Sequence, residues 1–502
     1  MSGLVTTSFR IHLARQFVEQ FSEAAPDYLY MFIARTRPWD DDQNPPTPSE
    51  TVSYTEYDIW NSMIAMKRVL TADVSYAAPR YDWSSGTVYD QYASNDTDLY
   101  TKDFYVFTED YNVYKCLSNY KGATSTIKPT GTANTPFVTG DGYKWKYMGS
   151  VSAPRAIKFL TTNYLPVQDL AVDDSSAQWD VQQTAANGAI ETCHVYTGGS
   201  NWPYHTGTLQ AAAANTATLA TGASAVNDYY NNGSIYIASG TGAGQIRRIS
   251  DYVGSTKVAH TLTAWSVQPD ATSTYVVGPR VALTGDGANF EAYATVSSGA
   301  VDKIVITDSG NNYSTASITI YGGIGSGANV VPQVSPPNGH GSSMIAELGG
   351  RYVTLAARFS GSESNTFITE NDYRIVGLIA NPLLANSSVA TGTTYDMTTV
   401  VDITGLSGEF MLDELVTGGT SGATGYVAQR HSTTALRLVE VDGTFSPAET
   451  ITGGSSSATA TVASVTLPDI LPFTGRIMYM DHRSPITRDA NQVEASRIVI
   501  RF

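Results

Sequence analysis

The strictest alternation of apolar and polar positions in this chain follows a glycine turn signal at Asp141-Gly142. Aromatic residues there occupy every second position, with lysines between them: Tyr143, Lys144, Trp145, Lys146 and Tyr147. This pattern predicts a short β-strand with an aromatic face and a cationic face, entered through a tight turn. The strand is either part of a hairpin with a stacked aromatic ladder or an aromatic and basic docking surface. The local pattern does not decide between the two.

The N-terminal part of the chain shows helical periodicity twice. Apolar residues recur every fourth position in residues 7–24, which predicts a helix. Thr7 or Ser8 is the expected N-cap, and Pro26 ends the helix. Its apolar positions are Phe9, Leu13, Phe17 and Phe21, with Val18 beside them. A second helix is predicted over residues 56–70, with Trp60, Met63 and Ile64 facing inward. Between them, residues 28–35 (YLYMFIAR) predict a strand buried on both faces.

Two predicted loops carry further tryptophans. Trp39 follows Arg37-Pro38 and precedes three aspartates and a proline-rich segment. Trp83 lies in the aromatic segment 78–92 (APRYDWSSGTVYDQY).

The composition changes near residue 175 to Ala, Thr, Ser, Gly and Tyr with short alternating strands. It returns to its first character near residue 345 and again near residue 467. We therefore predict a core of three pieces, 1–175, 345–390 and 467–502. Small β-modules interrupt it at 176–280, 281–344 and 391–466, since long insertions at surface loops cost little closure entropy.

The last module contains an internal repeat. Residues 408–428 (GEFMLDELVTGGTSGATGYVA) align with residues 443–463 (GTFSPAETITGGSSSATATVA) at a constant offset of 35. Two copies indicate a duplicated β-unit packed on itself, because a solenoid needs three or more repeats.

Composition narrows the class of protein. The 502 residues include 43 Gly and 31 Tyr but only 15% charged residues, which is typical of a mainly β protein with several domains. The net charge of −16 disfavours a nucleic-acid partner. The N-terminus lacks the pattern of a signal peptide and no run of apolar residues is long enough to span a membrane, so we expect a soluble protein made in a cytoplasm.

No motif indicates catalysis, and we predict no enzyme, cofactor or metal site. The glycine-rich segments 240–244 and 323–327 lack the spacing of nucleotide-binding loops and read as turns. Cys193-His194 with His205 could in principle share a metal, but no further ligand lies nearby in the sequence. The three aspartates after Trp39 lack the Gly and Glu of a calcium loop.

Four motif groups, in this order, resemble a known family. They are RTRPW (35–39) with DIWNSMIAMKRVL (58–70) and PRYDW (79–83); VYKCL (113–117) with GDGYKWKYM (140–148); YRIVGLIANPL from Tyr373; and IMYMDHRSPI (477–486) before a terminal strand expected to be buried. About half of the chain thus resembles the baseplate wedge protein, the eighth component, of T-even-type contractile-tailed bacteriophages. The inserted β-modules depart from that pattern and resemble modules of cyanophage tail proteins.

The resemblance implies a β-sandwich core with a few helices, α+β in character at the N-terminus, with small β-domains inserted. It also implies a homodimer that binds other baseplate wedge proteins, a structural role, and a virion location after synthesis in the host cytoplasm. The competing hypothesis is a tail-associated glycan-binding or glycan-degrading protein, because Tyr- and Trp-rich β-modules can stack on sugars. The residues expected in the core or at an interface are Trp39, Trp60, Trp83, Tyr143, Trp145 and Tyr147.

Overall fold

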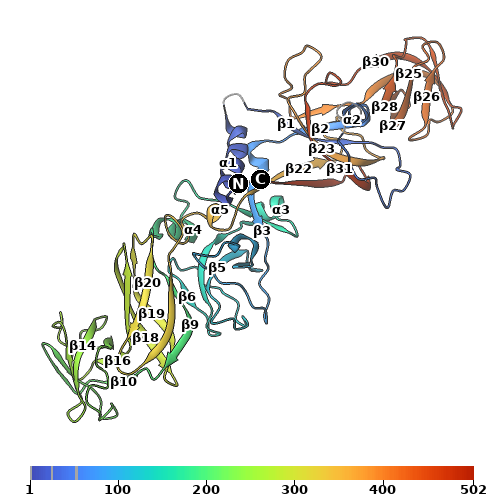
Figure 1. The fold of residues 1–502 in the computed structure, drawn as a ribbon. Helices are drawn as coiled ribbons and strands as arrows, with labels where there is room; N and C mark the ends of the chain where they lie inside the picture. The colour runs from blue at the N-terminus through green and yellow to red at the C-terminus, as the bar shows by residue number, and fades with distance from the viewer. Residues whose placement is uncertain (1–2, 24–25, 51–54) are drawn as a thin grey trace. The chain divides into compact units, whose positions relative to one another are not determined.

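The computed structural model describes residues 3–23, 26–50 and 55–502, and the fold is mainly β, as predicted (Figure 1). The chain forms two compact units. The first contains residues 1–77, 157–160 and 351–502, and the second contains 78–156 and 161–350. The predicted first core piece, 1–175, is therefore divided between the two units. No described helix has the length and apolar character needed to cross a membrane.

The first unit is built on a five-stranded sheet with β1 (Leu29–Ala34) at its centre. The sheet order is β24 (Thr394–Asp396), β2 (Met63–Arg68), β1, β23 (Asp372–Ala380) and β31 (Arg476–Thr487). All six residues of β1 are buried, as predicted for the segment 28–35. Met31 and Ile33 point into one hydrophobic cluster and Tyr30 and Phe32 into another, so both faces of the sheet are covered.

A second sheet completes a β-sandwich. In it β22 (Tyr352–Ser360) pairs with β3 (Val74–Pro79) on one side and β32 (Val493–Arg501) on the other. Residues of β22 such as Val353 and Leu355 share a hydrophobic cluster with Met31 and Ile33 of the first sheet. The final strand, β32, was expected to be buried; it has one buried residue, Ile498, because it lies at the sheet edge.

The predicted N-terminal helix is present but buries another face. It comprises α1 (Thr7–Glu19) and a 3₁₀ turn (Gln20–Ser22), and residue 24 lies outside the described residues. The N-cap is Thr6, so the predicted N-cap, Thr7 or Ser8, is wrong. Ile11 and Ala14 are buried, whereas Phe9 and Leu13 are exposed. A spacing of four residues drifts around a helix of 3.6 residues per turn, so only part of such a row faces the core.

The predicted helix over 56–70 is confirmed up to residue 62 and is wrong for residues 63–68, which form a strand. Helix α2 (Thr55–Ser62) ends where β2 begins, and β2 pairs with β1 along its length. Trp60, Met63 and Ile64 are buried as expected. A short apolar run fits a buried strand as well as a helix, and here pairing with β1 decides for the strand.

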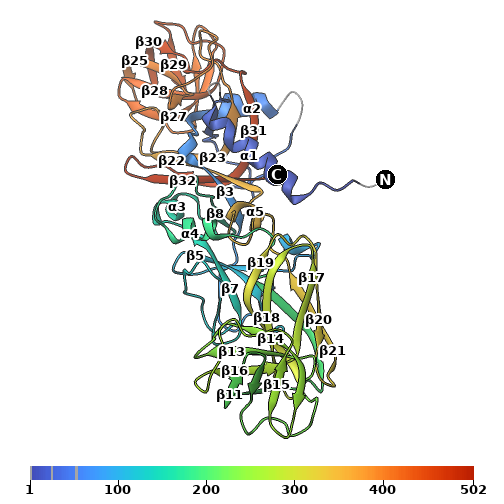
Figure 2. The same cartoon turned by 90° about the vertical axis from the view of Figure 1, so that its left-hand side faces the viewer.

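The predicted duplicated unit is a closed barrel (Figure 2). Its strand order is β25 (Thr399–Ser407), β28 (Ala435–Asp442), β27 (Thr424–Ser432), β26 (Leu415–Gly418), β29 (Thr450–Gly453) and β30 (Thr459–Thr466). Thr417 of β26 lies opposite Thr452 of β29, and these residues are equivalent in the two repeats. The barrel therefore has an internal pseudo-two-fold axis through this pair.

Each repeat supplies a buried glutamate to the other. Glu414 accepts hydrogen bonds from the backbone N–H groups of Ser455 and Ser456, and Glu449 accepts them from Thr420 and Ser421. A Cβ on Gly453 would lie 2.6 Å from the Glu414 carboxylate, and one on Gly418 would lie 2.8 Å from that of Glu449. The glycine pair in each repeat thus makes room for the glutamate of its partner repeat.

The second unit contains the sheet β4 (Tyr105–Phe107), β5 (Asn112–Ser118), β7 (Lys144–Ser150) and β6 (Phe137–Val138). Its other regular elements include β8 (Tyr164–Val167), α4 (Ala177–Thr184) and α5 (Met344–Glu347), and α3 spans Ala153–Phe159.

The modules predicted at 176–280 and 281–344 follow one another in the chain, with one sheet within residues 205–278 and another within 280–321. A further strand pair joins the start of the first module to the end of the second. β9 (Thr192–Ser200) pairs with β21 (Ser326–Gln333), and the segments between them form two sheets. One has the order β10 (His205–Thr208), β16 (Thr274–Gly278), β13 (Ser234–Ser239), β14 (Ile246–Val253), β15 (Val258–Thr261), β12 (Thr216–Thr218) and β11 (Ala211–Ala213). The other has the order β19 (Ala300–Asn311), β18 (Ala288–Ser297), β17 (Arg280–Gly285) and β20 (Ala316–Tyr321). Composition changes mark the modules but do not reveal which strands pair.

Candidate functional site

The candidate site is the pair of strands β5 and β7, where the sequence predicts an aromatic face and a cationic face. The two strands are antiparallel, with Cys116 opposite Trp145 and Lys115 opposite Lys146. Phe137 and Val138 of β6 pair with the start of β7 and complete the hairpin predicted at Asp141-Gly142. Gly142 has a φ of 91°, the conformation that the turn requires.

The aromatic face is the hydrophobic core of this sheet. Tyr143, Trp145 and Tyr147 are all buried. The rings of Tyr143 and Trp145 stack with centroids 5.3 Å apart, and the Tyr143 hydroxyl donates to the carbonyl of Ala123 at 2.6 Å. Of the two readings, the structure therefore favours the packed aromatic ladder, because the three rings face the interior of their own unit.

The cationic face is buried as well, which the alternation does not predict. Lys115 and Lys146 lie side by side across the two strands, each 1% exposed. Like charges opposite each other destabilise a sheet, and burial adds a desolvation cost. Such a pair is compatible with folding only if carboxylates reach both ammonium groups.

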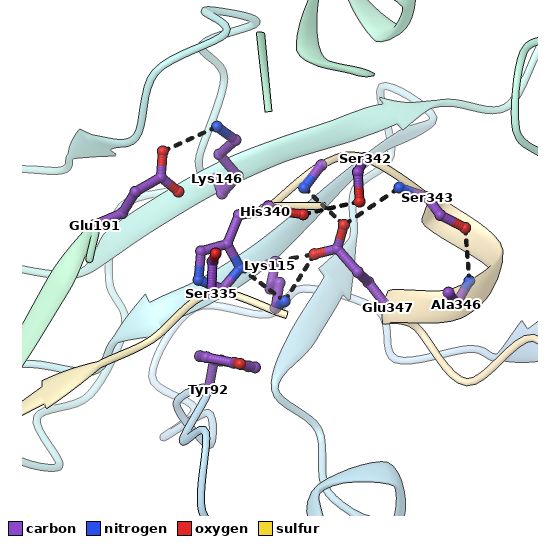
Figure 3. Close-up of polar contacts among 12 residues, drawn as sticks. Tyr92, Lys115, Lys146, Glu191, Ser335, His340, Ser342, Ser343, Ala346 and Glu347 are labelled. Atoms are coloured by element: carbon purple, nitrogen blue, oxygen red, sulfur yellow. Dashed lines mark hydrogen bonds and ion pairs between the residues drawn. The ribbon is translucent and has the colours of Figure 1, made fainter. Parts of the chain in front are cut away.

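Glu347 neutralises Lys115 (Figure 3). The Lys115 Nζ lies 2.8 Å from Glu347 Oε2 and 2.9 Å from His340 Nδ1, and the Tyr92 ring centroid is 4.1 Å away. Glu347 ends the short helix α5, and its other oxygen accepts the Gly341 N–H at 2.7 Å. The loop before α5 thus closes over β5.

Glu191 neutralises Lys146. The Lys146 Nζ lies 3.3 Å from Glu191 Oε1 and donates to the carbonyl of Asn134 at 2.8 Å. Lys144 donates to the backbone carbonyl of Glu191. The segment before β9 therefore covers the start of β7.

Burial and the neighbouring charge shift the pKa values of Glu347 and Lys115 in opposite directions. Burial raises the pKa of Glu347, but Lys115 and His340 outweigh it and lower the pKa to about 2. Burial lowers the pKa of Lys115, and Glu347 opposes that effect. Burial and then the Lys115 charge lower the pKa of His340, so its imidazole is held neutral. Its Nε2 atom is buried without a hydrogen-bond partner among the described residues.

The geometry defines what this cluster can do. Lys115, His340 and Glu347 contain the groups of an acid–base centre, but each is at most 4% exposed, so a substrate does not reach them in this conformation. The cluster instead fixes two loops to the strand pair. In the sequence its members are up to 232 positions apart, and no local signal connects them.

The predicted aromatics of the first unit are also packed. Trp39 lies between the Arg35 guanidinium, 4.0 Å from the ring, and His482, with ring centroids 4.7 Å apart, and its Nε1 donates to the carbonyl of Arg483. Trp60 is buried in the cluster that Trp39 contacts.

Trp83 belongs to the second unit. It is half-buried, packs against the Tyr143–Trp145 cluster, and donates from Nε1 to Ser125 Oγ at 3.1 Å.

Asp42, the last of the three aspartates after Trp39, is an ion-pair partner. Both of its carboxylate oxygens lie 2.9 Å from Arg374 nitrogens of β23. The Arg374 guanidinium lowers the pKa of Asp42 to about 2. Segments 35–42, 372–380 and 476–487, which carry three of the motif groups, therefore meet in one place.

Histidine and cysteine residues do not gather into a metal centre. His194 contacts Gln91 and the Leu117 carbonyl, whereas His205 contacts Tyr275. Within the residues that the structure describes, no group of three or more His, Cys, Asp or Glu side chains is arranged to hold a metal ion.

Two comparisons with known proteins found no match to this chain. No protein-family model matches the chain, and no curated protein matches it. The resemblance to baseplate wedge proteins stays a prediction.

Proposed function

We propose that this protein is a structural component of the baseplate wedge of a contractile bacteriophage tail. The observation that carries the proposal is the meeting of three motif groups around Trp39 and Asp42 in the first unit. Residues far apart in the sequence that resemble one family are expected to form one structural core if the resemblance is real. Their mutual contacts support that reading.

Two ion-pair clusters, one around Asp42 and Arg374 and one around Lys115 and Glu347, suit a structural role. Each connects distant chain segments through short ionic contacts, Asp42 with Arg374 and Lys115 with Glu347. Such contacts hold loops in one arrangement and make surfaces that can bind neighbours as rigid bodies. The protein would form a homodimer, link neighbouring wedge proteins and transmit the baseplate rearrangement that precedes sheath contraction.

Mass spectrometry of purified virions and of separated tails tests the proposal. We expect the chain in the tail fraction, at a copy number that is a multiple of six. Its absence from purified tails would overturn the proposal.

A second candidate function, glycan binding or degradation at the tail, is favoured by a cavity in the second unit with tyrosines in its wall. Incubating the purified protein with host envelope polysaccharide separates the two. Release of saccharides would contradict a purely structural role.

A further inference from the structure

The second unit has a cavity of about 640 Å³ beside the candidate site. Its wall is formed by the loop after β5, the start of β7, and strands β9 and β19. The volume is in the range of small-ligand sites, roughly 300–1,000 Å³. The buried Lys115 cluster does not line it.

The wall of the cavity carries excess positive charge in a chain of net charge −16. Lys121, Lys144 and Lys303 come from three different elements, and Asp302 is the one acidic residue among the described lining residues. Asp302 pairs with Lys121 at 3.4 Å. Neither Lys144 nor Lys303 forms an ion pair with a described carboxylate. The Lys144 ammonium already donates one hydrogen bond, to the Glu191 carbonyl, and keeps two donors for an anion, whereas the Lys303 side chain is exposed.

The same wall offers rings and apolar surface. Tyr196 is 58% exposed, and the Lys303 Nζ lies 4.8 Å from the centroid of the Tyr120 ring. Ile304 and Ile306 of β19 also line the cavity. A bare inorganic anion would use the lysines alone, and a neutral sugar would use the rings alone.

We propose that this cavity binds an acidic saccharide, with a carboxylate against Lys144 and Lys303 and a sugar ring against Tyr196. A sugar presents C–H groups to an aromatic face and a carboxylate gives charge-assisted hydrogen bonds to lysine, so one ligand satisfies both parts of the wall. This site is additional to the proposed structural role and does not depend on it.

Isothermal titration of the full-length protein with trigalacturonate tests the proposal, with maltotriose and inorganic phosphate as comparison ligands. We expect trigalacturonate to bind at least about tenfold more tightly than either. Lys303→Gln and Tyr196→Ala should each weaken binding by about tenfold. Both side chains are exposed, so the variants should fold, and circular dichroism checks this.

The matched control is Lys257→Gln, which removes a lysine of the same unit outside the cavity. It should bind trigalacturonate like the unchanged protein. No binding of trigalacturonate, equal binding of phosphate or of maltotriose, or an equal loss in Lys257→Gln would each overturn the proposal. Virion composition has no bearing on these outcomes.

Discussion

Lys115 and Lys146 show how the environment of one residue depends on distant parts of the chain. Strict alternation correctly places both lysines on the face opposite the aromatics, yet both are buried. Each is buried because a carboxylate reaches it, Glu347 in one case and Glu191 in the other. No pattern within the strand contains that information.

Removing one partner of the Lys115–Glu347 pair should destabilise the second unit strongly. Lys115→Met leaves a buried carboxylate without its cation, and we expect a loss of about 3–5 kcal/mol in unfolding free energy. The double variant Lys115→Met, Glu347→Leu should lose less unfolding free energy than Lys115→Met alone, since neither charge of the pair remains without its partner. Urea denaturation measures both.

Lys128→Met is the control, because Lys128 pairs with the exposed Glu109 and Asp110. It should shift the urea midpoint little. A single variant Lys115→Met as stable as this control would show that the buried pair contributes nothing.

Acid should destabilise the second unit in two steps. The pKa of His340 is lowered below its ordinary value of 6.5 in the folded protein, so protonation favours the unfolded chain and stability falls as pH drops below about 6.5. The pKa of Glu347 is about 2 against an ordinary 4.5, so its contribution is lost as pH falls from 4.5 towards 2.

His340→Asn should reduce the dependence of the melting temperature on pH between 7 and 5. Burial lowers the pKa of His194 as well, so part of the dependence should remain. An unchanged profile would mean that His340 does not titrate on unfolding.

Trp145→Ala should cost about 3–5 kcal/mol of unfolding free energy, because it removes the largest fully buried side chain of the aromatic core. Val138→Ala in the adjacent strand is the control, since Val138 is 61% exposed. Thermal unfolding followed by tyrosine fluorescence compares the two. Equal midpoints would contradict the assignment of Trp145 to the core.

At the scale of elements, the sequence predicts strands better than it predicts their partners. The segment 28–35 is apolar at nearly every position, and it is the central strand β1, covered on both faces. Residues 63–68 have the same character but follow a helical pattern, and only their pairing with β1 makes them a strand. β9 and β21 pair although Ser200 and its partner Ser326 are 126 positions apart in the sequence, which no periodicity can show.

The barrel is the element that the sequence describes most fully. The repeat offset of 35 predicts two equivalent halves, and equivalent residues such as Glu414 and Glu449 make equivalent hydrogen bonds. The repeat does not predict that each glutamate accepts hydrogen bonds from the turn of the other repeat.

Glu449→Gln should therefore destabilise the barrel although it changes one atom. The carboxylate accepts backbone N–H groups of Thr420, Ser421 and Ser446, and these contacts lower its pKa to about 2 although burial raises it. Losing the charge should cost about 2 kcal/mol. Glu409→Gln, with a side chain 77% exposed, should have little effect in the same thermal-unfolding measurement.

At the scale of the whole molecule, the mainly β class follows from composition, whereas the division into units does not. Residues 1–77 join with residues 351–502, and residues 78–156 join with 161–350. The first 175 residues have one composition throughout, so composition offers no boundary near residue 77. The motif groups indicate long-range contacts more reliably than composition does, because three of them meet around Trp39 and Asp42.

A cryo-electron microscopy map of the tail baseplate would show directly whether this protein is a component of the wedge. We predict that each unit of this chain fits density in every wedge, with the barrel of residues 399–466 recognisable as a closed six-stranded body. Two copies per wedge would agree with the proposed homodimer. A complete baseplate map in which no density accommodates either unit would contradict the proposed structural role.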